Sequence, residues 1–170
     1  MKAKLIVEGK EFDIEINDPE LQKLIKPEKK TGYEPSKYHW SYFYVNDDGE
    51  AKVCIETNEL KNQNHYNEAN YYSDKTIAEN NARADRLMRQ LRRFAVFHRN
   101  ESLDWNNTND VSCKYYIFYD YADRRLGVDD VSWNRDLFNV YFDSKADADA
   151  AVELLHDELI WYFTEYKDSL

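Results

Sequence analysis

DKTIAENNARADRLMRQLRRFAVFHR, residues 74–99, is the stretch that decides the fold. Its apolar side chains recur at intervals of three, four and seven, which places them in one sector of an α-helix. These side chains are Ile77, Ala84, Leu87, Met88, Leu91, Phe94 and Ala95. The spacing predicts a long helix that covers a sheet with this apolar face.

Arginines occupy the opposite side of the same predicted helix. Arg86, Arg89 and Arg93, here called the arginine stripe, have Arg83 and Arg92 at their flanks. Three interpretations stay open: a solvated face, a site for phosphates or nucleic acid, or a contact with an acidic protein surface. That acidic surface belongs either to a partner or to a second copy of this chain. The stripe is therefore a candidate partner-binding surface.

Strand-like segments precede this helix, and a similar series follows it. Strands are expected at 37–45, at 51–57 and in a third segment that ends at Tyr71-Tyr72; a polar, asparagine-rich loop separates the last two. The second series is expected at 114–121, 126–132 and 137–142, with a helix that Ser144 caps. Residues 71–79 also match residues 141–149 at a spacing of seventy. This match predicts an internal duplication.

The N-terminal segment predicts an addition to these two units. Alternating residues at 3–8 and 11–16 predict a hairpin, and a short helix is expected between Asp18 and Pro27. The fold class is thus expected to be α+β, with two tandem βββα units, an N-terminal β-hairpin and short helix, and antiparallel sheets covered by two long helices. The expected domains, forming one compact body, are 1–34 for the hairpin and helix, 35–100 for the first βββα unit and 101–170 for the second, acidic unit.

Charge is unevenly distributed along the chain. The 170 residues include 33 acids and 23 lysines and arginines, a net charge of -10. Residues 101–170 contain 16 of the acids and 6 of the bases, so they carry the whole net charge. A negative field repels nucleic acid and anionic membranes, so neither direct DNA binding nor membrane binding is expected.

Acidic side chains of the second unit form another candidate partner-binding site. They are expected on strands, turns and a helix of one small unit, where a continuous negative surface could imitate a phosphate backbone. The set comprises Asp129, Asp130, Asp136, Asp143, Asp147, Asp149, Asp157 and Glu158. The competing interpretation is an acidic surface that only keeps the protein soluble.

Residues for catalysis or metal binding form no motif. None of the four histidines pairs at a metal-binding spacing, and His156-Asp157-Glu158 are consecutive, so they fan around a helix. The four glycines are scattered, which excludes a phosphate-binding loop. Two cysteines and the lack of a long apolar run indicate an intracellular protein. We expect no enzyme, no catalytic residue, no cofactor and no metal.

Several segments resemble a known group of proteins. They are MKAKLIVEGKEF (1–12), KKTGYE (29–34), NYYSDKTIAENNARADRLMRQLRRFA (70–95), KYYIFYDYADRRLGV (114–128) and NVYFDSKADADAA (139–151). They look like small accessory proteins of phages and prophages of Gram-positive bacteria. The resemblance spans nearly the whole chain and carries no known functional residue. It implies a phage product in the cytoplasm of the bacterial host cell, where small non-enzymatic proteins disable host defences.

These observations predict a phage-encoded, non-catalytic inhibitor of a host defence nuclease, of the anti-CRISPR or anti-restriction kind. It would bind a host nucleic-acid-processing protein or complex, by nucleic-acid mimicry or allosterically. A homodimer is a further expectation, because residues 37–45 and 114–121 carry aromatic side chains on both faces of their strands. The alternatives are a binder that sequesters a nucleotide signal, a structural or regulatory phage protein, and an enzyme with an unrecognised site.

Overall fold

Helices and small antiparallel sheets make up the described part of the chain, so the predicted α+β class is confirmed. The structure is a computed structural model, and it describes residues 2–7, 10–15, 17, 30–100, 103–107, 111–137 and 139–168. It divides the chain into two units, Met1–Thr31 and Gly32–Leu170. The short helix expected between Asp18 and Pro27 lies outside the described residues.

The first unit contains the predicted hairpin. Strand β1 (Lys2–Val7) pairs with β2 (Lys10–Glu15) in antiparallel register, with Leu5 opposite Phe12. Phe12 on β2 is 49% exposed.

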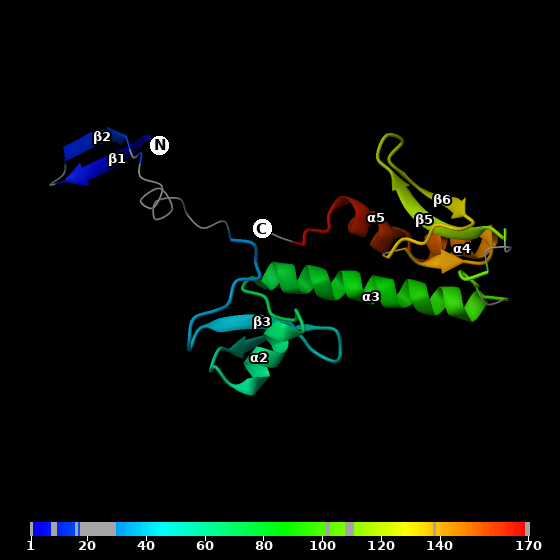
Figure 1. The fold of residues 1–170 in the computed structure, drawn as a ribbon, viewed down its shortest axis with the longest axis horizontal. Helices are drawn as coiled ribbons and strands as arrows, with labels where there is room; N and C mark the ends of the chain where they lie inside the picture. The colour runs from blue at the N-terminus through cyan, green and yellow to red at the C-terminus, as the bar shows by residue number, and fades with distance from the viewer. Residues whose placement is uncertain are drawn as a thin grey trace. The chain divides into compact units, whose positions relative to one another are not determined.

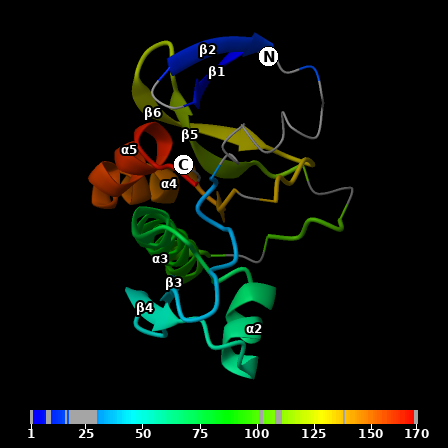
Figure 2. The same ribbon diagram turned by 90° about the vertical axis from the view of Figure 1, so that its left-hand side faces the viewer.

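The long helix of the second unit is α3 (Lys75–His98), as the spacing of apolar residues predicts. The Asp74 side chain caps it by accepting a hydrogen bond from the Ile77 amide at 3.0 Å. Among the predicted core residues, Leu87 and Leu91 are buried, with 1% and 5% of their surfaces exposed. The helix lies between two sets of elements, one on either side (Figures 1 and 2).

On one side of α3 lies a two-stranded sheet with a short helix. Strands β3 (Ser41–Val45) and β4 (Ala51–Ile55) pair through a turn that contains Gly49, whose φ of 76° suits glycine. Helix α2 (Leu60–Asn67) follows β4. A small core joins this sheet to α3 through Ile77 and Ala78.

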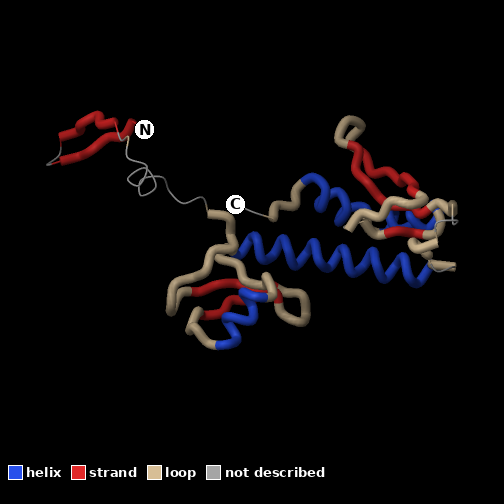
Figure 3. Tube along the Cα trace, in the orientation of Figure 1, coloured by secondary structure: helices blue, strands red, loops and turns tan. Residues whose placement is uncertain are grey.

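On the other side lie the remaining strands and helices. Strands β5 (Lys114–Asp120), β6 (Arg125–Val131) and β7 (Tyr141–Phe142) form an antiparallel sheet in the order β6-β5-β7. Helices α4 (Lys145–Leu154) and α5 (His156–Thr164) cover one face of it, and their buried side chains join those of α3 in the larger core. Figure 3 shows the helices of this unit in blue and its strands in red.

The first half departs from the predicted three strands and a helix. Helix α2 occupies the segment expected to be an asparagine-rich loop. The third strand is reduced to one bridge, in which Phe43 and Tyr72 exchange two backbone hydrogen bonds of 2.8 Å. The one buried residue of helix α2 is Asn62, which attaches the helix through polar contacts. The helix therefore has no repeat of apolar residues from which the sequence could predict it.

The second half departs from the prediction at its helix. The expected single helix after Ser144 is interrupted at Leu155, where φ is -114° and ψ is 21°. The second long helix is therefore absent, and α4 and α5 take its place. No proline or glycine marks the interruption, so apolar spacing alone predicts a continuous helix. The expected strand at 137–142 is also shortened, to Tyr141–Phe142.

Matching positions seventy residues apart have matching roles. Ser144 caps α4 as Asp74 caps α3, and Ala148 and Ala78 are both fully buried. The ion pair between Lys145 and Asp149 (2.7 Å) corresponds to that between Lys75 and Glu79 (2.9 Å). The agreement favours the duplication, which stays a prediction.

Candidate functional site

Three of the predicted acidic residues, Asp129, Asp130 and Asp136, act electrostatically on Tyr116. Asp129 lies opposite Tyr116 in the pairing of β6 with β5, and Asp130 is its neighbour on β6. Burial raises the pKa of Tyr116, and the charges of Asp129, Asp136 and Asp130 raise this pKa further. We call Asp129, Asp130 and Asp136 the acidic patch; all three side chains are exposed.

Four other predicted acids already have partners within the chain. The Asp143 carboxylate accepts a hydrogen bond from the Asn100 amide at 2.7 Å, and Asp147 accepts one from the Ser144 hydroxyl at 2.6 Å. Asp149 pairs with Lys145, and Glu158 pairs with Arg83.

The eight acids therefore do not meet in one cluster. The last of them, Asp157, is exposed on α5 beside His156, and Asp149 lies on α4. Among the eight, Asp129, Asp130 and Asp136 are the three that raise the pKa of Tyr116; the first two lie on β6 and the third in the segment that follows it.

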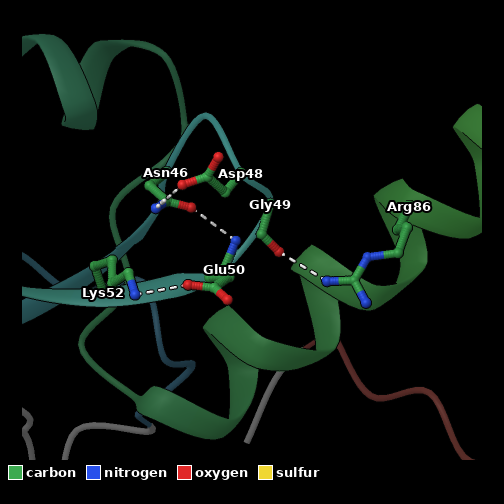
Figure 4. A network of polar contacts seen from close by, with 6 residues as sticks. All are labelled: Asn46, Asp48, Gly49, Glu50, Lys52 and Arg86. Carbon is green, nitrogen blue, oxygen red and sulfur yellow. Dashed lines mark hydrogen bonds and ion pairs between the residues drawn. The ribbon is translucent and has the colours of Figure 1, made fainter.

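The arginine stripe is partly used by contacts within the chain. Arg86, Arg89 and Arg93 are exposed, as predicted. The Arg86 guanidinium, however, donates a 3.1 Å hydrogen bond to the carbonyl of Gly49 in the β3–β4 turn (Figure 4). The stripe is thus attached to the turn at Arg86, and the Arg89 guanidinium also lies close to Gly49 in this turn.

The flank of the stripe is engaged as well. The Arg83 Nε atom donates to Glu158 at 2.7 Å, and its guanidinium stacks 4.0 Å from the centre of the Trp161 ring. A groove of about 390 Å³ separates the β3–β4 turn from α5, and its lining combines Arg83 and Arg86 with Glu50, Glu79 and Glu158. Because acidic and basic side chains both line this groove, it is not a positively charged site for an anion.

The β3–β4 turn carries its own network of contacts, which Figure 4 shows. Asn46 accepts a hydrogen bond from the Glu50 amide at 2.8 Å, and Lys52 pairs with the Glu50 carboxylate at 2.6 Å. Lys52 chiefly, and Arg86 to a smaller extent, lower the pKa of the Glu50 carboxyl. The turn is therefore a fixed point to which Arg86 is attached.

A third group of arginines was not singled out from the sequence. Arg92, Arg99 and Arg135 line a pocket of about 430 Å³ together with Trp105 and Tyr141. We call it the arginine pocket. Arg92 and Arg99 are seven residues apart, a spacing that puts them on one side of a helix. The sequence could therefore have suggested that Arg92 and Arg99 lie together. It could not suggest Arg135, which the tertiary fold brings to the same pocket.

A buried polar network links α2 to β3. The Asn62 amide donates to the Tyr42 hydroxyl at 3.0 Å, and this hydroxyl lies 2.8 Å from His65 Nδ1. Burial raises the pKa of both Tyr42 and Tyr71, so both hydroxyls stay protonated at neutral pH. Tyr71 donates to Glu56 at 2.8 Å. The network is suited to holding α2 in place.

The His65 contact makes a pH dependence of stability testable. The Tyr42 hydroxyl, which accepts from Asn62, can donate its proton to Nδ1 only when His65 is neutral. Burial lowers the pKa of His65. The unfolded chain then binds this proton at a higher pH than the folded chain, so unfolding free energy should decrease as the pH falls from about 7 to 5.

Chemical denaturation at several pH values measures this decrease. In the His65→Gln variant, stability at pH 7 should be lower because the Tyr42 hydroxyl loses its acceptor, and the slope against pH should be shallower. Parallel pH profiles for the two proteins would contradict the assignment to His65.

The described residues include no group of three histidine, cysteine, aspartate or glutamate side chains arranged to hold a metal ion. Cys54 and Cys113 are both free thiols. Of the helices that the structure describes, none combines the length and apolar character needed to cross a membrane. Comparisons with protein-family models, curated proteins and solved structures found no match.

Proposed function

We propose that the chain is a non-catalytic inhibitor that binds a host nucleic-acid-processing protein, in the cytoplasm of a phage-infected bacterium, through the acidic patch. The observation that carries the proposal is the arrangement of Asp129, Asp130 and Asp136. All three carboxylates are exposed and raise the pKa of Tyr116, and within the described residues none of them has a lysine or arginine partner. A basic groove that normally holds phosphates would supply the missing cations.

The position of the patch in the sheet supports this role. Strand β6 is an edge of the sheet β6-β5-β7, so its outer side has no pairing partner in the part of the chain that the structure describes. Asp129 shares the sheet face of Tyr116, and Tyr116 packs against the Tyr141 ring at 6.1 Å between centroids. A tyrosine beside carboxylates is a suitable anchor at a protein interface. The patch therefore combines charge for association with apolar surface for affinity.

Another explanation for acids on an edge strand is protection against pairing between sheet edges. Both explanations predict exposed carboxylates, but they predict different effects when these carboxylates are replaced by neutral side chains. Loss of edge protection causes aggregation and leaves binding to a target unchanged, whereas loss of mimicry weakens binding in a protein that stays monodisperse.

The proposal rests on the acidic patch rather than on the arginine stripe. Arg86 donates to Gly49, and Arg83 at the flank pairs with Glu158, so two of these guanidinium groups have partners within the chain. Arg89 and Arg93 remain exposed and can supplement an interface. They are too few to make it a phosphate-binding surface.

The test uses the triple variant Asp129→Asn, Asp130→Asn and Asp136→Asn. A nuclease captured from the phage's host by the tagged wild-type protein would be purified and its association measured at low and physiological salt. We expect the variant to associate roughly tenfold more slowly, because charge complementarity acts mainly on the association rate. Excess wild-type protein should also prevent the nuclease from binding DNA or guide RNA.

The matched control is Asp47→Asn, Asp85→Asn and Glu153→Gln, which removes three exposed negative charges elsewhere. This control should associate at close to the wild-type rate. If both triple variants slow association equally, only net charge matters and the patch has no specific role. A nuclease that holds nucleic acid and this protein at once would exclude mimicry.

A further inference from the structure

We propose that the arginine pocket binds a small molecule that carries a phosphate monoester, such as a nucleoside monophosphate. The pocket adjoins the acidic patch, because Arg135 directly precedes Asp136, but its proposed ligand does not depend on the inhibitor function. It lies where α3 ends: Arg92 and Arg99 come from the end of α3, and Arg135 comes from the segment between β6 and β7. Trp105 and Tyr141 complete its walls.

The first argument is an uncompensated positive charge. Arg92, Arg99 and Arg135 line one pocket, and the other described residues of its lining carry no carboxylate. None of the three forms an ion pair with another described residue. Guanidinium groups that line one pocket repel one another. An anion bound among them would add attractive interactions that offset this repulsion. In a chain with a net charge of -10, three arginines that line one pocket are a local concentration of positive charge.

The second argument is an unpaired polar atom. The Arg99 Nε atom is buried, and it has no hydrogen-bond partner among the described residues. Buried N–H groups in native structures nearly always have an acceptor, because leaving one unpaired is unfavourable. A ligand oxygen in the pocket would supply the acceptor. This observation is independent of the charge count, and it also indicates an anionic ligand.

The number and type of donors favour phosphate over carboxylate. A phosphate monoester carries about 1.5 to 2 negative charges at neutral pH and three acceptor oxygens, whereas a carboxylate carries one charge and two oxygens. Guanidinium groups bind phosphate oxygens in pairs through their planar N–H forks. Three arginines therefore match one terminal phosphate in both charge and number of donors.

The rest of the pocket suits an organic group attached to that phosphate. The rings of Trp105 and Tyr141 meet edge to face with centroids 4.7 Å apart, and the Arg135 guanidinium lies 5.7 Å from the Trp105 ring centre. The volume of about 430 Å³ falls within the range of roughly 300–1,000 Å³ that is usual for small-molecule sites. A mononucleotide is of this size, and its base could pack against the aromatic wall.

Neighbouring carboxylates select against a longer nucleic acid. Asp136 follows Arg135 directly, accepts a hydrogen bond from Asn139 at 3.2 Å, and belongs to the acidic patch. A polynucleotide that placed one phosphate in the pocket would carry its next phosphates past Asp136, where like charges repel. A single compact phosphate ester avoids this cost.

Isothermal titration calorimetry with three probes tests the proposal on the full chain. Adenosine 5′-monophosphate and inorganic pyrophosphate should bind, and adenosine, which lacks the phosphate, should bind at least tenfold more weakly. The variants Arg99→Gln and Arg135→Gln should each weaken binding of the monophosphate at least tenfold. Arg135 is exposed in a connecting segment, so its variant tests the site without endangering the fold.

Arg89→Gln is the matched control, because it removes an exposed arginine from the same helix outside the pocket. It should change the affinity less than twofold. The proposal is overturned if the monophosphate and pyrophosphate fail to bind at millimolar concentration, or if Arg89→Gln weakens binding as much as Arg99→Gln does. It is also overturned if a single-stranded oligonucleotide binds while the monophosphate does not, since the site would then be one for nucleic acid.

Discussion

Replacing Phe142 by alanine is expected to lower the free energy of unfolding by about 3 to 5 kcal/mol, the usual cost of removing a buried phenylalanine. Phe142 is 1% exposed and belongs to the core shared by α3, α4 and α5. Its ring meets that of Phe94 edge to face, with centroids 6.4 Å apart. It also holds β7 to β5, opposite Tyr115. The substitution therefore opens a cavity where three helices and a sheet meet.

Denaturant unfolding followed by circular dichroism measures this loss, and Phe97→Ala is its control. Phe97 is the same residue type on α3, yet 76% of its surface is exposed. Its replacement should change the unfolding free energy by less than about 0.5 kcal/mol. A small effect of Phe142→Ala, comparable to that of Phe97→Ala, would contradict the assignment of the shared core.

The sequence predicted the elements whose burial follows a regular period. Helix α3 is the clearest case, because Leu87 and Leu91 recur on one face while Asp74 offers a cap. Strands β3 and β5 were predicted from segments with aromatic side chains on both faces, and the structure has a strand in each segment. In α3 the apolar side chains face a core, so the sequence pattern and the packing carry the same information.

Elements held by polar contacts gave no such signal. Helix α2 has one buried side chain, Asn62, and the periodicity of apolar residues does not register it. The interruption of the helix at Leu155 was not predicted either, because the sequence has no proline or glycine there and its apolar spacing continues. Tertiary packing determines both features, and the local sequence alone does not predict that packing.

The candidate sites also differ in how far the sequence could predict them. The acidic patch could be predicted in part, since Asp129 and Asp130 are adjacent in the sequence and the strand exposes them. The arginine pocket could not, because Arg135 joins Arg92 and Arg99 only through the path of the chain between β6 and β7. Residues from distant segments that share no periodic pattern are brought together by topology alone.

Replacing Asn62 by alanine is expected to lower the free energy of unfolding by about 2 to 4 kcal/mol, since each buried group left unpaired costs about 1 to 3 kcal/mol. Asn62 is 3% exposed. Its Oδ1 accepts from the Thr57 amide, the Thr57 hydroxyl and the Glu59 amide, at 2.9 to 3.2 Å. Its Nδ2 donates to the Ile55 carbonyl at 3.1 Å and to the Tyr42 hydroxyl at 3.0 Å. Alanine removes the partner of all these groups at once.

The control for Asn62→Ala is Asn64→Ala, on the same helix at an exposed position. Both variants change helix propensity equally, so the difference between their unfolding free energies isolates the buried contacts. Hydrogen exchange adds a local measurement: Asn62→Ala should speed exchange at the amides of α2 more than at those of α4, because α2 has no other buried side chain to hold it. Equal losses in the two variants, with exchange in α2 unchanged, would mean that the helix is held by something other than Asn62.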